Sequence, residues 1–101
     1  MLSVDVFRDL EKTVPELLAE LRRVITAIPS MREMVVLPTA TTPDTWPGQH
    51  VTYSVDEAPD LPNQLLILEN HGLCRLLRPG FAYRLSEPLV KYLKRTSTAV
   101  D

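Results

Sequence analysis

Apolar residues spaced three and four positions apart mark the most regular helix in the chain. The stripe consists of Leu17, Leu18, Leu21, Val24, Ile25 and Ile28, and this spacing places all six on one face of a helix. The residues TVPE predict where the helix starts, because Thr13 and Glu16 can form a capping box and Pro15 is tolerated in a first turn. Pro29 predicts where it ends.

A shorter apolar stripe precedes this helix and consists of Val6, Phe7 and Leu10. It indicates helical structure at the N-terminus as well. Two helices that break near Thr13 and one kinked helix over residues 3–28 both fit the pattern.

The pattern then changes to one that is typical of strands. MVVL at residues 34–37 is a short β-branched run closed by Pro38, and HVTYSV at residues 50–55 alternates apolar and polar side chains. Both features favour strands over helices. We therefore predict a pair of strands after the first helical segment.

A loop rich in proline connects the two predicted strands. PTATTPDTWPGQ contains three prolines and no hydrophobic period, and loops of this length in a compact domain are often functional. Trp46 lies in it beside Pro47, where it is a candidate anchor for a partner. The alternative is that Trp46 folds back to cover the core, as large aromatic side chains commonly do.

A further helix is expected from Leu61 to about His71. Asp60 can cap its start, Pro62 fits its first turn, and Gly72 can supply the left-handed residue that stops it. Its apolar positions are Leu61, Leu65, Leu66, Ile67 and Leu68. So wide an apolar face predicts a helix that lies deeply buried in the centre of the fold.

Residues 73–85, LCRLLRPGFAYRL, predict a β-hairpin. Pro79 and Gly80 suit the two central positions of a type II turn, and a two-residue loop places Arg75 opposite Arg84. Alternation then sends Cys74, Leu76, Phe81, Tyr83 and Leu85 inward, and Leu73, Leu77 and Ala82 outward with the two arginines. Opposed like charges destabilise a strand pair, so this pairing favours a bound anion, either a phosphate or a carboxylate, on the outer face.

Charge is unevenly distributed along a chain whose net charge is −2. Residues 1–60 carry five Lys or Arg against ten Asp or Glu, whereas residues 61–101 carry six against three. This asymmetry favours a basic surface that meets an anionic partner. The candidate anion- or nucleic-acid-binding residues are Arg75, Arg78, Arg84, Lys91, Lys94 and Arg95.

The segments LENHGL, CRLLRPGFAYRL and SEPLVKYLKR together resemble the second half of the winged-helix family, over residues 61–95. The resemblance implies a recognition helix, then a two-stranded wing, then a final helix. It makes Asn63, Gln64 and Asn70 exposed positions of the recognition helix. It also implies that the wing arginines Arg75, Arg78 and Arg84 meet phosphate.

Two features differ from the winged helices that bind DNA. HVTYSVDEAPD, a predicted strand and an acidic turn, stands where those proteins place a helix. The segment between Leu61 and His71 also contains no Lys or Arg, although contacts to phosphates and guanines commonly use these residues. The usual docking of a recognition helix in the major groove is therefore not favoured.

Composition limits the architecture and the compartment. With 101 residues, 45% of them hydrophobic and 24% charged, the chain has the balance of one folded domain. We expect this domain to span residues 1–96, followed by a flexible tail at residues 97–101. No apolar run is long enough to span a membrane, and the single cysteine, Cys74, allows no internal disulfide, so a cytoplasmic location is expected.

The residue types needed for catalysis do not gather in the sequence. His71 and Cys74 are close in sequence but are too few to hold a metal, and His50 lies on a different segment. Cys74 is predicted to face inward, which disfavours a reactive thiolate. We therefore predict no catalytic residues, no metal site and no cofactor.

These observations predict a small α+β domain with the element order ααββαββα and a winged-helix-like C-terminal half. The favoured function is a non-enzymatic protein-interaction or assembly module, and self-association into a homodimer is expected. Its candidate partner-binding residues are Trp46, Asn63 and Gln64. The alternative is a winged-helix-like regulator that binds nucleic acid through the hairpin at residues 73–85.

Overall fold

Helices and strands follow one another in the order ααββαββα in the computed structural model, which describes residues 4–77 and 81–97. This order confirms the predicted α+β class. The elements are α1 (Val4–Thr13), α2 (Pro15–Ala27), β1 (Glu33–Leu37), β2 (Val51–Ser54), α3 (Leu61–Asn70), β3 (Cys74–Leu77), β4 (Ala82–Leu85) and α4 (Glu87–Ser97). Of the predicted tail, residues 98–101 lie outside the described residues.

The N-terminal segment consists of two helices rather than one kinked helix, because α1 ends at Thr13 and α2 begins at Pro15. The predicted capping box is wrong. The Thr13 hydroxyl donates to the backbone oxygen of Asp9 at 2.8 Å, and the N-cap residue of α2 is Val14, which offers no side-chain cap hydrogen bond. Pro15 begins α2 at a position where the backbone N–H would lack a helical partner in any case.

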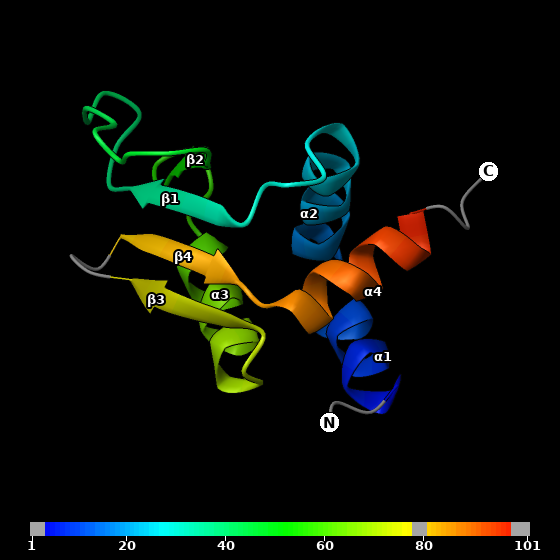
Figure 1. The fold of residues 1–101 in the computed structure, drawn as a ribbon. Helices are drawn as coiled ribbons and strands as arrows, with labels where there is room; N and C mark the ends of the chain where they lie inside the picture. The colour runs from blue at the N-terminus through cyan, green and yellow to red at the C-terminus, as the bar shows by residue number, and fades with distance from the viewer. Residues whose placement is uncertain (1–3, 78–80, 98–101) are drawn as a thin grey trace.

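The four strands form one sheet in the order β2-β1-β4-β3. β1 and β2 are parallel, whereas β1–β4 and β3–β4 are antiparallel. Parallel neighbours cannot be joined by a tight turn, which explains the long connection over residues 38–50, the Trp46 loop. In Figure 1, α3 lies behind the sheet, and α1, α2 and α4 gather at the end where β1 begins and β4 ends.

The main core lies between one face of the sheet and the helices. Met34 and Val36 from β1 point into it together with Leu85 from β4. The helices contribute side chains that are almost completely buried, among them Leu10, Leu18, Leu21, Ile25, Leu65, Leu68, Leu89 and Leu93. The predicted stripe of α2 is thus confirmed, except that Ile28 lies just beyond the helix and is 39% exposed.

The opposite face of the sheet carries a second, smaller core. Val35, Leu37 and Ala82 are buried there, with Trp46 and Phe81 packed against them. β1 is therefore buried on both faces, which agrees with its unbroken apolar run. The Trp46 loop provides part of the cover on this outer face.

Helix α3 covers the sheet with one face only. Leu61, Leu65 and Leu68 are buried, but Leu66 is 51% exposed. The expectation that α3 is enclosed at the centre of the fold was wrong, because Leu66 points away from the sheet. Gly72 has a φ of +73° and ends the helical segment as predicted.

Helix α4 is braced against both N-terminal helices. The Tyr92 ring stacks on Phe7 of α1 with centroids 4.2 Å apart, and its hydroxyl donates to Glu11 at 2.5 Å. Arg22 of α2 also donates to Glu11, and it contacts Thr96 of α4 at 2.8 Å. These contacts hold the second half of α4 against α1 and α2.

Candidate anion-binding groove

The hairpin pairs in the register that the two-residue turn predicts. Arg75 lies opposite Arg84, Cys74 opposite Leu85, and Leu77 opposite Ala82. The turn itself, with Arg78, Pro79 and Gly80, lies outside the described residues. The two arginines are therefore cross-strand neighbours, and both are exposed.

The predicted division of the hairpin into inner and outer faces is only partly correct. Cys74, Tyr83 and Leu85 pack in or against the main core as expected. Leu76 lies on the edge strand and is 42% exposed. Phe81 instead joins the outer core, and Leu73, predicted to point outward, is fully buried in the main core. The alternation between inner and outer faces does not extend to Leu73 and Phe81, because both lie just outside the paired strands.

A groove opens where α3 leads into β3 and β4 leads into α4. Its volume is about 320 Å³, and it is lined by Gly72, Cys74, Arg75, Arg84, Leu85, Ser86 and Glu87. We call it the arginine groove. Ser86 shapes one end of it, since its hydroxyl accepts the Leu89 amide at 3.3 Å and so caps the first turn of α4.

The two arginines of the groove differ in their partners. Arg84 donates to Glu33 at 3.1 Å, and Glu33 also accepts the Trp46 indole N–H at 3.0 Å. Arg75 has no ion pair or side-chain hydrogen bond within the described residues. Among the described residues, the charge of Arg75 is therefore unpaired, and Arg75 lies directly across the strands from Arg84.

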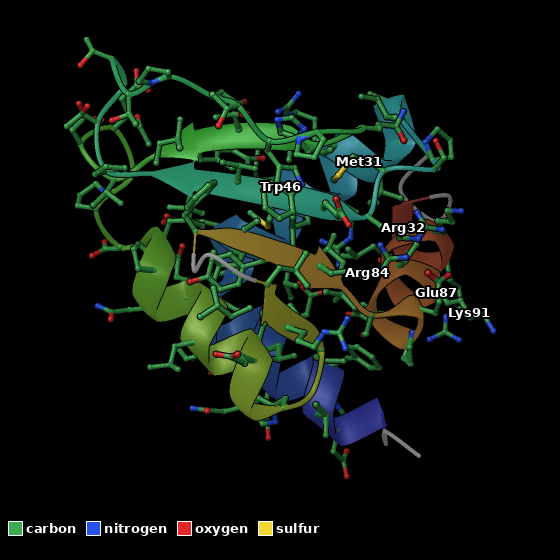
Figure 2. The ribbon with its side chains drawn as sticks, turned by 60° about the vertical axis from the view of Figure 1, so that its left-hand side comes forward. Met31, Arg32, Trp46, Arg84, Glu87 and Lys91 are labelled. Carbon is green, nitrogen blue, oxygen red and sulfur yellow. The ribbon has the colours of Figure 1, made fainter. Side chains whose placement is uncertain are left out.

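A further ion pair lies beside the groove, at the start of α4. Arg32 donates to Glu87 at 2.8 Å, and this hydrogen bond is the main reason why the pKa of Glu87 is lowered. The positive charges of Lys94 and Arg84 lower it further. Figure 2 shows Arg32, Arg84, Glu87 and Lys91 around the start of α4. The local charge is thus positive, although one carboxylate lines the groove.

The remaining predicted site residues lie elsewhere. Lys94 and Arg95 belong to the last turn of α4, where the Arg95 guanidinium lies 5.9 Å from the centre of the Tyr92 ring. Asn63 is exposed on α3. Gln64 lines a separate apolar pocket of about 140 Å³ between α2, β2 and α3. The structure therefore brings together Arg75 and Arg84, but it does not bring Asn63 or Gln64 to them.

Trp46 lies over the outer face of the sheet. Its ring meets Phe81 edge to face with centroids 5.9 Å apart, and its indole N–H is bonded to Glu33. Figure 2 shows the side chain across β1. The side chain is only partly buried, so it covers the outer core and still keeps an accessible edge.

We expect Trp46, the only tryptophan of the chain, to emit at wavelengths between those of free and fully buried indole. The emission spectrum of the native chain, compared with that of the unfolded chain, measures this directly. Phe81→Ala should shift the emission to the red, because it removes one wall of the indole site. Emission equal to that of the unfolded chain would show that Trp46 leaves the sheet in solution.

Three residues near the groove were missed in the sequence. Glu33 begins β1 and Arg32 precedes it, and both lie at least forty positions before the hairpin in sequence. Glu87 lies two positions after the hairpin ends at Leu85, and this closeness in sequence was the one available signal. Charged residues at strand ends are common, and only the pairing of β1 with β4 joins Glu33 to Arg84.

Comparison with family models, with curated proteins and with solved structures gives no significant match.

Two further observations concern the described part of the chain. None of its helices has both the length and the apolar character needed to cross a bilayer. No group of three or more His, Cys, Asp or Glu side chains within it is arranged to hold a metal ion.

The thiol of Cys74 is buried, which raises its pKa to about 12, and it donates weakly to the Leu65 carbonyl at 3.5 Å. Such a thiol is a poor nucleophile near neutral pH.

Proposed function

We propose that this chain is a non-enzymatic interaction module whose arginine groove binds an acidic segment of a partner protein. The observation that carries the proposal is the pairing of exposed Arg75 with Arg84 in a groove of about 320 Å³. Guanidinium groups bind carboxylates through two parallel hydrogen bonds. A carboxylate of the partner, placed between the two arginines, would also relieve their mutual repulsion.

An acidic protein segment suits the surroundings better than a nucleic acid does. Helix α3 carries no Lys or Arg, and Glu69 is its only charged residue. Glu33 and Glu87 flank the arginines, and both carboxylates would repel a continuous phosphate backbone. A short peptide can place one acidic side chain in the groove and avoid these two carboxylates. The hairpin and the winged-helix resemblance support nucleic-acid binding as the alternative.

Fluorescence anisotropy with labelled ligands separates the two classes of partner. The ligands are an acidic peptide rich in Glu and Asp, its Gln and Asn counterpart, and a generic DNA duplex, each measured at two salt concentrations. We expect the acidic peptide to bind and the other two ligands to bind much more weakly at physiological salt. Tighter binding of the duplex, with a steep salt dependence, would replace this proposal with the alternative.

The predicted homodimer belongs to the same proposal, and exposed hydrophobic side chains support it. The apolar stripes of α1 and α2 are buried within one chain. Among the described residues, the large hydrophobic side chains that remain exposed are Ile28, Leu66 and Leu76. Leu66 and Leu76 belong to one surface, since Glu69, one turn after Leu66, accepts the Leu76 amide at 3.3 Å.

If these leucines form a self-interface, light scattering at micromolar concentration should give twice the mass of one chain. Leu66→Ala should then shift the equilibrium toward the monomer, because it removes apolar area from the interface. A monomer mass that is unchanged on dilution would remove the homodimer from the proposal. The arginine groove would be unaffected by that result.

A reducing, cytoplasmic setting is also part of the proposal. Cys74 is the only cysteine of the chain, and its thiol is buried. No disulfide within the chain can contribute to its stability. The module is therefore suited to a compartment in which thiols stay reduced.

A further inference from the structure

The Trp46 loop is closed by a histidine whose two ring nitrogens both meet oxygen atoms. Nδ1 of His50 lies 2.8 Å from the backbone oxygen of Gly48. Nε2 lies 2.9 and 3.1 Å from the two carboxylate oxygens of Asp44. Only 14% of the His50 side chain is exposed, so water has little access to take the place of these contacts.

Both of these partners can only accept hydrogen bonds. A backbone carbonyl has no proton to give, and an ionised carboxylate has none either. Both ring nitrogens must therefore donate, and only the imidazolium form of histidine has two N–H groups. A neutral ring would turn one nitrogen lone pair toward an oxygen lone pair, so one of the two contacts would be lost.

We propose that His50 and Asp44 form a proton-dependent latch, which holds the Trp46 loop most firmly on the outer face of the sheet while His50 is protonated and loosens when His50 loses its proton. The inference does not depend on the function proposed for the arginine groove.

Asp44 extends the latch to the rest of the loop and to the sheet. One of its oxygens accepts the Thr52 hydroxyl of β2, and the other accepts the Trp46 backbone amide at 3.2 Å. The Trp46 indole in turn bonds to Glu33, which pairs with Arg84. A continuous set of contacts therefore runs from His50 to the arginine groove.

The electrostatic surroundings favour the protonated ring. The charged groups that face His50 are Asp44 from its own loop and Glu33 from β1, and both are acidic. The hydrogen bond to Asp44 is the main cause that raises the pKa of His50, and partial burial opposes it. The pKa of Asp44 is lowered, first by the Thr52 hydroxyl and then by His50.

The direction of the pH effect follows from these two shifts. A raised histidine pKa stabilises the latch fully below the ordinary value of about 6.5, and the stabilisation is lost as pH rises through the raised pKa. A lowered aspartate pKa stabilises it above about 3.9, and that part is lost as pH falls through the lowered pKa. The latch is therefore closed in mildly acidic solution and loosens as pH rises above the raised pKa of His50.

An NMR titration of the full chain tests the latch without any ligand. In a His71→Gln background, which leaves a single histidine, the ring signals of His50 and the Trp46 backbone amide are followed from pH 5 to 9. We expect His50 to titrate with a midpoint above about 6.5. We also expect the Trp46 amide to shift with the same midpoint as its acceptor moves away.

Two variants serve as controls. His50→Gln should abolish the Trp46 amide transition, and Asp44→Asn should lower the midpoint of both signals together, since the carboxylate charge is gone. Amide dispersion outside the loop reports whether each variant is still folded. A His50 midpoint at or below the ordinary value, or a Trp46 amide that does not follow it, would overturn the latch.

Discussion

The variant in which both Arg75 and Arg84 are replaced by alanine is expected to bind the acidic peptide more weakly than the native chain, by up to about 30-fold. Partly exposed ion pairs contribute up to about 1 kcal/mol each, and about 1.4 kcal/mol corresponds to a factor of ten. Loss of two such contacts, about 2 kcal/mol at most, gives this upper limit. Anisotropy titrations with the same labelled peptide measure it.

The fold should survive this double replacement. Removal of Arg75 relieves its repulsion with Arg84 across the strands. Loss of the Arg84–Glu33 pair costs little, because the Arg84 side chain is 49% exposed and the pair is screened by solvent. We expect a change in the free energy of unfolding within about 1 kcal/mol.

A matched control is Arg8→Ala, which removes one positive charge from an exposed position of α1 that does not line the groove. It should leave peptide affinity nearly unchanged. If the double variant instead unfolds with a loss of several kcal/mol, the two arginines are structural. If the chain binds duplex DNA, the double variant should reduce the salt dependence of the DNA affinity by about two phosphate contacts.

The second large effect concerns two neighbouring leucines on α3. Leu65→Ala is expected to lower the free energy of unfolding by about 2–5 kcal/mol, because it leaves a cavity at a fully buried position. Leu66→Ala should change it by no more than about 0.5 kcal/mol, because Leu66 is half exposed and alanine is at least as good a helix former. Urea unfolding at low protein concentration measures both values.

The adjacent positions make each variant the control of the other. Both remove the same atoms from the same helix, so a difference between them reports burial alone. Equal losses would mean that Leu66 is covered in solution. If those losses grew with protein concentration, the cover would be a second copy of the chain.

Local signals in the sequence predicted the helices and strands and the two arginines of the groove. The spacing of α2, the prolines at its two ends and Gly72 after α3 act within a few residues, so their effect does not depend on the rest of the chain. The register of the hairpin is of the same kind, since a two-residue loop predicts which residues face each other. Arg75 and Arg84 could therefore be paired from the sequence.

The partner of Arg84 could not be found in the same way. Glu33 reaches Arg84 only because β1 pairs with β4, and that pairing joins segments about fifty residues apart in sequence. Trp46 reaches Glu33 because its loop folds back over the sheet. Neither contact leaves a local pattern, since each depends on the way the whole sheet is assembled.

The sequence by itself determined the succession of helical and strand segments, though not whether the first is one helix or two, together with the starts and ends of most elements and the opposed arginines, because backbone preferences and periodicity are local properties. Only the tertiary structure decided that β1 and β2 are parallel, that the outer face is covered by the Trp46 loop, and that Leu66 is exposed while Leu73 is buried. Apolar character predicts that a side chain is suited to a core. Which of several such side chains is enclosed depends on the neighbours that the completed sheet and helices bring to it.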